Sequence, residues 1–529
     1  MSMISLPEHV PVLIAGGGPV GLTAAALLAR FNIPSIVIEA DTDYCEGSRA
    51  ICMSRRSQEI LSWIGADKAL VDKGLSWVGG RSYWRNIEVL HFEMPHEPTQ
   101  RYAPMVNIQQ YYLEQFIHQA LEQSQPNSVY WGHKVLDVQQ TATAAQVLIQ
   151  LPEGNTQTVT ADWVIACDGG RSTVREVLGL ALKGMQYDGR YVIVDIKQKT
   201  QRPVERLAWF DPPSNPNSTL LMHRQPDEVW RIDYQIRPDE DPLEAVKPEN
   251  VLPRIQSHLA MIGETEPWEV LWISLYNAKC LSLENYRHGR VFFAGDAAHL
   301  VPIFGVRGLN SGLDDVSSLV WKLASVCQGT AADSVLDSYS IGRVAATQEN
   351  IAYGAKSTEF MAPPNRAFEL MREAALRLAV VDKSVASLIN PRQSTPIVYS
   401  TSPLNIVAQD QWFSTLAQAG APAPEALLTD ERGQPRYLTE YFGKEWVLIV
   451  FSQPALTTTL RQTLLNLPWQ VVIVGAEGLH DTYQQVQERY GFAEGEQGLI
   501  LVRPDGYILG RWSGLALDTC VNAWQNKGF

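Results

Sequence analysis

The sequence predicts an α/β protein with three parts: a Rossmann-like first domain, an antiparallel sheet inserted into it, and a smaller α/β domain at the C-terminus. Three patterns predict this architecture. Residues 10–40 read as strand, glycine turn, helix and strand, which is a βαβ unit. Residues 185–285 contain short strands of alternating side chains between loops rich in proline and asparagine. Residues 446–526 follow the order βαβαββα.

The composition indicates a globular chain that can bury large cores, because 45% of its 529 residues are hydrophobic and 19% are charged. The 43 basic and 57 acidic residues give a net charge of −14. Since an acidic surface repels phosphate groups, we expect neither nucleic-acid binding nor docking on an anionic membrane. No apolar run reaches the length of about 18 residues that a membrane-spanning helix needs.

Cysteine and histidine usage adds two expectations. The six cysteines are scattered and form no CxxC pair, so we interpret them as reduced thiols of a cytoplasmic protein. The ten histidines include no HExxH motif, and the sequence predicts no metal site.

The first unit carries the motif Gly16-x-Gly18-x-x-Gly21 between an apolar strand at 10–15 and a helix. In such a turn the first glycine permits the sharp bend, the second lets the backbone approach a pyrophosphate, and the third lets the helix pack on the strand. Glu39 ends the next strand, where a carboxylate accepts both ribose hydroxyls of an adenosine and repels a 2′-phosphate. The sequence therefore predicts a tightly bound FAD or NAD rather than NADP.

Two further motifs place a carboxylate directly after an apolar strand. Asp168 opens Asp168-Gly169-x-x-Ser172-x-Val174-Arg175, and Asp296 follows Gly295 after the strand VFFA. A carboxylate at a strand end is suited to accept hydrogen bonds from a sugar or ribityl chain. Either motif alone is also typical of a helix cap or an Asx-turn, but their combination with the glycine turn favours cofactor binding.

The changes in pattern also predict domain boundaries. We assign residues 1–180 and 286–385 to the first domain and 181–285 to the inserted sheet. Residues 386–445 are expected to be a linker with irregular structure, and 446–529 form the C-terminal domain.

In order and spacing, the three motifs closely resemble those of the single-component FAD-dependent aromatic hydroxylases, which have the p-hydroxybenzoate hydroxylase fold. The resemblance covers residues 8–385. The most similar branch contains 3-(3-hydroxyphenyl)propionate, phenol and polyketide hydroxylases, which carry an added C-terminal thioredoxin-like domain. Residues 446–526 fit that addition. Because Phe451-Ser452-Gln453-Pro454 stands where thioredoxins have CxxC, we expect this domain to be redox-inert.

The resemblance implies roles for individual residues. It implies that Glu39 holds the adenosine ribose, Arg49 the pyrophosphate, and Gln110 the region of the ribityl chain and phosphates. The remaining positions that it assigns to the cofactor are the turn residues Gly16, Gly18, Pro19, Val20 and Gly21, a backbone contact from Val135 to adenine, Asp168 and Arg175, Asp296 at the ribityl hydroxyls, and Pro302, Gly308, Leu309 and Asn310 near the flavin ring.

The segment after Asp296 departs from the family pattern HxxPPxGGxGxNxG at three positions. Ile303 replaces a proline, Val306 replaces a glycine, and Arg307 stands where glutamine is common. Two interpretations of Arg307 remain open. It is a solvent-facing loop residue, or its guanidinium lies near the flavin or the pocket mouth, where it would act on the reduced flavin or on an anionic substrate.

The family chemistry implies an enzyme that uses NADPH or NADH and O2 to hydroxylate a phenolic or polyketide-like aromatic through a flavin C4a-hydroperoxide. The sequence identifies no catalytic base, and His223, Arg231, Asp233 and Tyr234 are interpreted as ordinary sheet surface. A Baeyer–Villiger oxygenase or flavin oxidase on the same fold remains an alternative, as does a non-catalytic FAD-binding sensor. The expected partners are a small aromatic substrate and O2, with the C-terminal domain packed on the flavin domain or at a homodimer interface.

Overall fold

A computed structural model of the chain describes residues 5–302, 304–389, 393–407, 417–452, 455–492 and 496–529. Its first domain is built on a sheet of order β17-β18-β11-β1-β2-β8, in which β18, β11, β1, β2 and β8 pair in parallel. The strands of this sheet are β1 (His9–Ala15), β2 (Ser35–Glu39), β8 (Val129–Trp131), β9 (Lys134–Gln140), β10 (Ala145–Gln150), β11 (Thr156–Ala166), β17 (Arg287–His288) and β18 (Val291–Phe293).

Helices cover this sheet, and α1 (Pro19–Arg30) packs on both α4 (Gln110–Ser124) and α8 (Gly308–Cys327). Proline at its first position favours the start of α1, and its alanines allow close contact with both neighbours. The predicted βαβ unit is confirmed. The other helices of the first domain are α2 (Arg55–Trp63), α3 (Asp67–Lys73), α5 (Thr173–Val177), α9 (Asp337–Met361) and α10 (Arg366–Val381).

The inserted sheet has the order β19-β16-β12-β15-β14-β13-β5-β6. Its strands are β5 (Gly79–Trp84), β6 (Ile87–Glu93), β12 (Lys183–Gln198), β13 (Arg206–Phe210), β14 (Thr219–Gln225), β15 (Val229–Gln235), β16 (Trp268–Ser282) and β19 (His299–Leu300). The sequence placed this sheet within 181–285, whereas residues 79–93 add two strands to its edge and β19 adds one at the other end. Strands β5 and β6 are far away in sequence and β19 has only two residues, so local pattern could not assign them.

Two helices and a small sheet complete the first domain and the inserted sheet. Helix α7 (Pro248–Ile262), preceded by the short α6 (Pro242–Ala245), buries its apolar side against one face of the inserted sheet. Strands β3 (Cys52–Ser54), β7 (Met105–Asn107) and β4 (Leu75–Trp77) form a small antiparallel sheet. Within the described residues, no helix has the length and apolarity to cross a membrane, and no group of His, Cys, Asp and Glu is arranged to hold a metal.

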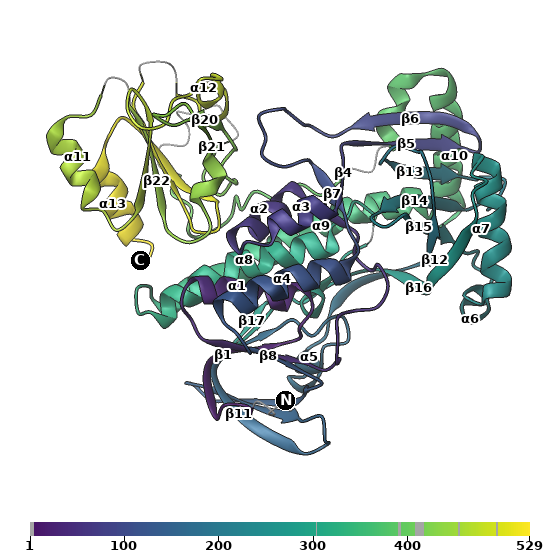
Figure 1. The fold of residues 1–529 in the computed structure, drawn as a ribbon, viewed down its shortest axis with the longest axis horizontal. Coiled ribbons are helices and arrows are strands. Elements are labelled where there is room, and N and C mark those ends of the chain that lie inside the picture. The colour runs from purple at the N-terminus through teal and green to yellow at the C-terminus, as the bar shows by residue number, and fades with distance from the viewer. Residues whose placement is uncertain (1–4, 303, 390–392, 408–416, 453–454, 493–495) are drawn as a thin grey trace.

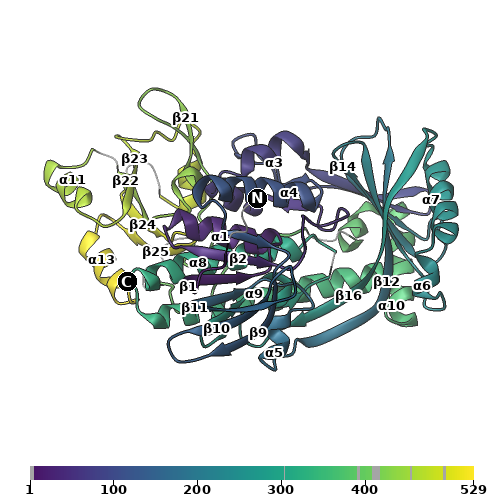
Figure 2. The same ribbon diagram turned by 60° about the horizontal axis from the view of Figure 1, so that its bottom comes forward.

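The C-terminal domain lies at the opposite end of the molecule from the inserted sheet (Figures 1 and 2). Its sheet has the order β23-β22-β24-β25, with β22 and β23 parallel and the other pairs antiparallel, as expected for a thioredoxin-like unit. Its elements are β22 (Val447–Ser452), α11 (Thr458–Leu465), β23 (Gln470–Gly475), α12 (Gln485–Tyr490), β24 (Gly498–Val502), β25 (Ile508–Ser513) and α13 (Leu517–Gln525). The preceding region also contains the hairpin β20 (Leu427–Thr429) and β21 (Pro435–Tyr437).

The turn Pro504-Asp505-Gly506 joins β24 and β25. Cys520 is fully buried, and burial raises the pKa of its thiol, which keeps it protonated and unreactive. Gln453 and Pro454, at the position of the missing CxxC, lie outside the described residues.

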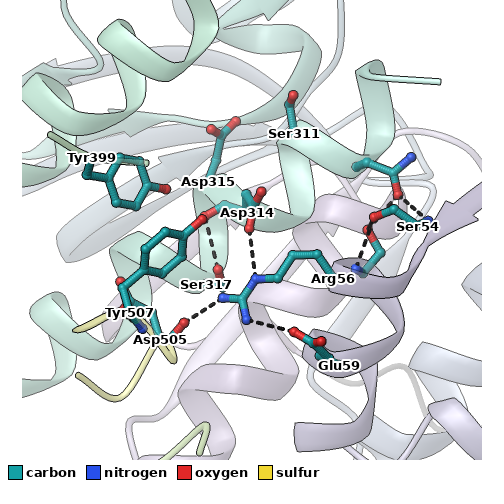
Figure 3. A network of polar contacts seen from close by, with 12 residues as sticks. Ser54, Arg56, Glu59, Ser311, Asp314, Asp315, Ser317, Tyr399, Asp505 and Tyr507 are labelled. Atoms are coloured by element: carbon teal, nitrogen blue, oxygen red, sulfur yellow. Dashed lines mark hydrogen bonds and ion pairs between the residues drawn. The ribbon is translucent and has the colours of Figure 1, made fainter. Parts of the chain in front are cut away.

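The Asp505 turn attaches the C-terminal domain to the first domain through a buried polar network (Figure 3). Arg56 on α2 donates to the Asp505 carbonyl (2.5 Å), to Asp314 on α8 (3.2 Å) and to Glu59 (3.2 Å). The Trp321 indole on α8 donates to the Asp505 carboxylate at 3.0 Å. Because Arg56 is 5% exposed, solvent does not screen these contacts.

We expect Arg56→Met to destabilise the protein by about 3–5 kcal/mol, because it leaves Asp314 and Glu59 without their buried cation. The exposed pair of Arg366 and Glu369 provides a matched control, since solvent screens this pair and Arg366→Met should leave the stability almost unchanged. Chemical denaturation of the two variants measures the difference. Equal stabilities would show that the network does not hold the domains together.

Candidate functional site

A cavity of about 700 Å³ lies between the carboxyl ends of β1, β2, β11 and β18 and one face of the inserted sheet. Its wall includes most of the positions predicted from sequence: Gly16, Gly18, Pro19, Val20, Glu39, Arg49, Gln110, Val135, Asp168, Asp296, Arg307, Gly308, Leu309 and Asn310. Parallel strands place their ends and following turns at one edge of the sheet, which is where open α/β folds bind ligands. The structure therefore brings residues from five separate motifs to one site.

The glycine turn has the shape that a bound pyrophosphate needs. Gly16 has a φ of +102°, and a Cβ there would lie 2.4 Å from the Cys167 carbonyl oxygen. A Cβ on Gly21 would lie 2.0 Å from the Gly16 carbonyl oxygen, so this glycine packs the helix on the turn and does not line the cavity. A Cβ on Gly18 would meet no atom within 4 Å. The backbone at Gly18 thus faces open space at the N-terminus of α1, which attracts phosphate.

Glu39 is held in place by the backbone around it. Its carboxylate accepts hydrogen bonds from the N–H of Gly17 at 2.5 Å and from the N–H of Asp41 at 2.8 Å. These bonds use one lone pair of each oxygen and leave the others available to ribose hydroxyls. The position fits the adenosine end of a dinucleotide.

Asp168 and Asp296 follow the neighbouring strands β11 and β18. One Asp168 oxygen accepts from the Val174 N–H at 3.0 Å, while Oδ1 is buried and accepts no hydrogen bond from any described residue. Burial raises the pKa of this carboxyl, although hydrogen bonds from Ser172 and nearby N–H groups oppose the shift. Asp296 projects into the cavity and is exposed there. An unsatisfied acceptor and an open carboxylate at these strand ends fit a hydroxyl-rich ligand.

Arg175 connects these two motifs rather than lining the cavity. Its guanidinium donates to the carbonyls of Ala297 at 2.9 Å and Gly170 at 2.7 Å. The resemblance placed Arg175 in a motif associated with both FAD and nicotinamide, and in the structure its two hydrogen bonds join the turns that follow β11 and β18. Pro302 also lies outside the cavity wall, where it packs near Gly354 of α9.

The N-terminus of α8 opens toward the cavity at Gly308, Leu309 and Asn310. The first N–H groups of a helix have no intrahelical acceptor and carry a partial positive charge. The Asn310 side chain fixes this end, because its oxygen accepts from the Ser54 N–H at 2.9 Å and its amide donates to the Cys52 carbonyl at 3.0 Å. This end of α8 therefore presents backbone donors in a fixed place.

Val306 and Arg307, which differ from the family pattern, have an unusual backbone conformation and an unexpected burial, respectively. Val306, which stands where the family pattern has glycine, has a φ of +53°, a left-handed conformation that is strained for a β-branched residue. Ile303 lies outside the described residues. Arg307 is only 2% exposed, so its interpretation as a solvent-facing residue is wrong. Its guanidinium donates to Asn350 at 2.7 Å and lies over Tyr353, which ties the loop to α9.

Two of the remaining residues predicted to contact the cofactor, Arg49 and Gln110, already use some of their hydrogen-bonding groups within the protein. Arg49 has a φ of +45° and borders the cavity, and its Nε donates to the Glu46 carbonyl. Gln110 accepts from the Ala50 N–H at 3.2 Å and donates to Glu114 at 2.9 Å. Val135 lies in β9 at the adenosine end of the cavity wall. Gln110 thus shapes the loop of Arg49 whether or not it also contacts a ligand.

The sequence interpretation missed polar residues on the opposite wall. Arg206, His223, Arg231 and Asp233 were overlooked or interpreted as sheet surface, but they are buried and line the cavity. Tyr234 alone points to the other face, into the core under α7. The available signal was the alternation of Arg231 and Asp233 with apolar neighbours in an otherwise apolar strand.

The fold and the cavity define a class: a flavoprotein in which a dinucleotide lies along the strand ends and a second sheet closes the site. The family described as FAD binding domain matches residues 9–353, so the chain belongs to this FAD-binding family. FAD is accordingly its cofactor, and the glycine turn, Glu39 and Asp296 fit that group.

Similar proteins agree with this assignment. The chain is 26% identical over 375 residues to 3-(3-hydroxy-phenyl)propionate/3-hydroxycinnamic acid hydroxylase of Mycolicibacterium smegmatis, which covers 71% of this chain and 65% of the relative. The match thus spans just under two thirds of that relative's length. The fold of this chain is similar to that of the flavin-dependent monooxygenase PieE (TM-score 0.83, 21% identity, 99% of both chains). It is also similar to that of aklavinone-11 hydroxylase (TM-score 0.76, 23% identity, 99% of both chains).

Replacing Gly18 and Gly21 separates cofactor binding from folding. Gly18→Ala adds a methyl group into open space, so the FAD-free protein should melt normally while its FAD dissociation constant rises about tenfold or more. Gly21→Ala forces a contact with the Gly16 carbonyl and should cost about 1–3 kcal/mol of stability even without FAD. Thermal melting and FAD titration of both apoproteins test this contrast. Normal FAD affinity in Gly18→Ala would remove the turn from the cofactor site.

Asp296→Ala should weaken FAD binding by about 1–3 kcal/mol, because it removes acceptors for ligand hydroxyls in the cavity. Asp239→Ala, at an exposed carboxylate in a surface ion pair, is the control and should bind FAD like the wild type. Flavin content after purification and a titration of the stripped protein measure the effect. An unchanged affinity would contradict the role of Asp296.

Proposed function

We propose that this protein is an FAD-dependent monooxygenase that uses NAD(P)H and O2 to hydroxylate a phenolic or polyketide-like aromatic. The main observation in support is that one cavity is lined on one side by Gly18, Asp296 and the N-terminus of α8. Its other side is a face of the inserted sheet that carries both apolar and polar residues. A substrate on that wall would lie in the same enclosed space as the cofactor. The hydroxylase names of the relatives support the same reaction class.

FAD, which the glycine turn at Gly18, Glu39 and Asp296 would hold, would supply the redox chemistry of this reaction: NAD(P)H would be the electron source, one oxygen atom of O2 would enter the ring and the other would leave as water. The chain itself supplies binding and electrostatics. The N–H groups at the start of α8 favour the negative charge that accumulates on a reduced flavin. Ile193, Leu221 and Phe304 give the wall an apolar surface for an aromatic ring, and enclosure by the two sheets limits water.

Phenol-stimulated consumption of NAD(P)H tests this function. We expect the FAD-loaded protein to oxidise NADPH or NADH slowly alone and at least about tenfold faster with an accepted aromatic, as binding of the correct substrate organises the site. The product should gain one oxygen atom by mass spectrometry and keep its aromatic absorbance.

The other outcomes identify the alternatives. A product with one added oxygen and a lost aromatic ring or an inserted ester indicates a Baeyer–Villiger oxygenase, and stoichiometric peroxide without product indicates an oxidase. FAD binding without any stimulated turnover across phenols and polyketide-like aromatics would leave the non-catalytic sensor.

A further inference from the structure

A row of polar residues crosses the inserted sheet on the face that lines the cavity. His223 lies directly opposite Arg231, and Arg231 lies opposite Asp195. The pairing of Leu207 with Met222, continued by one residue, places Arg206 beside His223. Side chains in a row across a sheet point to the same face, so the four groups are neighbours.

Two members of this row are satisfied by the protein. Arg231 donates to Asp233 at 2.8 Å and to the Arg49 carbonyl. Asp195 accepts from the N–H of Ser48 at 3.0 Å and from its hydroxyl at 2.8 Å. These contacts hold the Ser48–Arg49 loop against the sheet and close one end of the row.

Arg206 and His223, the other two members of the row, have buried polar atoms without a hydrogen-bond partner among the described residues. Arg206 is 3% exposed, and its guanidinium makes no hydrogen bond and no ion pair with any residue that the structure describes. His223 is 5% exposed, its Nδ1 is buried without a partner among these residues, and its ring forms an edge-on pair with Trp77. Burial of a guanidinium with unused donors is unfavourable unless a ligand supplies acceptors and a counter-charge.

The charge states make this pair suited to an anion. Burial lowers the pKa of Arg206 to about 10, which still leaves it charged at neutral pH. Burial, together with Arg206 and Arg231, holds the pKa of His223 well below its usual range, so the imidazole is neutral. The pair thus offers one cation with a forked set of donors and one neutral ring that donates or accepts.

We propose that Arg206 anchors an anionic oxygen group of the aromatic substrate, with His223 as the second polar contact to the same group. Arg206 and the α8 terminus line the same cavity, so an acid anchored at Arg206 would share that cavity with the cofactor. This inference rests on the proposed function, which it deepens to an aromatic acid or a phenolate. A carboxylate and a phenolate share the required chemistry.

Ligand binding to the FAD-loaded protein tests the anchor independently of turnover. The probes are 3-(3-hydroxyphenyl)propionate and its neutral amide, with binding followed by calorimetry and by the flavin absorbance. We expect the wild type to favour the acid and Arg206→Gln to bind it about 10- to 100-fold more weakly, with little change for the amide. Arg206→Lys should recover part of the loss, and His223→Leu should show a smaller loss.

Arg81→Gln is the matched control, because Arg81 lies on the adjacent strand β5 but pairs with Glu88 and Glu205 away from the cavity. It should bind both probes like the wild type. Melting of the ligand-free holoprotein adds a second readout. Since Arg206 makes no hydrogen bond or ion pair with a described residue, Arg206→Gln should melt at the same temperature or higher, whereas loss of a structural arginine lowers the melting temperature.

Binding of 4-nitrophenol, which has no carboxylate, distinguishes a phenolate from a carboxylate as the anchored group. Its affinity is measured at a pH below and at a pH above the pKa of its own hydroxyl group. A loss in Arg206→Gln confined to the ionised form supports a phenolate, and a loss confined to the propionate supports a carboxylate. Arg206→Gln that binds every probe like the wild type, a wild type that binds no anionic probe, or a lowered melting temperature with unchanged binding would overturn the anchor. Stimulated turnover of 3-(3-hydroxyphenyl)propionate that is unaffected in Arg206→Gln would overturn the anchor and leave the proposed function intact.

Discussion

The cofactor side of the structure depends on one buried carboxylate, Asp315 on α8. It accepts from the Gly295 N–H at 2.9 Å and from Arg343 on α9 at 2.6 Å, and it pairs with His299 at 2.7 Å. Burial would raise the pKa of this carboxyl, but His299, Arg343 and the Gly295 N–H hold it below its usual range. These bonds fix the loop that carries Asp296 to the same helix whose N-terminus faces the cavity. Asp315 thus fixes two parts of the cavity wall that come from separate parts of the chain.

The cofactor half of the site was predictable because its signals are local. The positions of Gly16, Gly18 and Glu39 follow from a turn between adjacent strands, and Asp168 and Asp296 follow directly from the strands that precede them. The opposite wall was not predictable in this way. The neighbours of Arg206 depend on pairing between strands, and β5 joins this sheet from more than a hundred residues earlier in the chain. Alternation could show that Arg231 and Asp233 share a face, but not that this face closes a cavity.

The departures from the family pattern show the same limit. Sequence could show that Val306 and Arg307 are unusual but not how they are accommodated. The structure shows that Arg307 bonds to Asn350 and that Asn350 in turn donates to Ser311 at 3.0 Å. The strained Val306 therefore directly precedes Arg307, whose side chain is anchored on α9, and the start of α8 follows at Gly308. A rigid loop of this kind keeps a strained conformation that a glycine would otherwise be needed to provide.

The C-terminal domain has a physical role that its missing thiol pair does not suggest. Its Asp505 turn binds Arg56 of α2 and Trp321 of α8, and its Arg503 holds the Asp505 carboxylate with two bonds of 2.9 Å. Helix α2 begins at Ser54, whose N–H bonds to the Asn310 side chain at the cavity end of α8. The C-terminal domain therefore contacts both α2 and α8, the two helices that meet at the cavity. These contacts restrain the helix whose first N–H groups face the cavity.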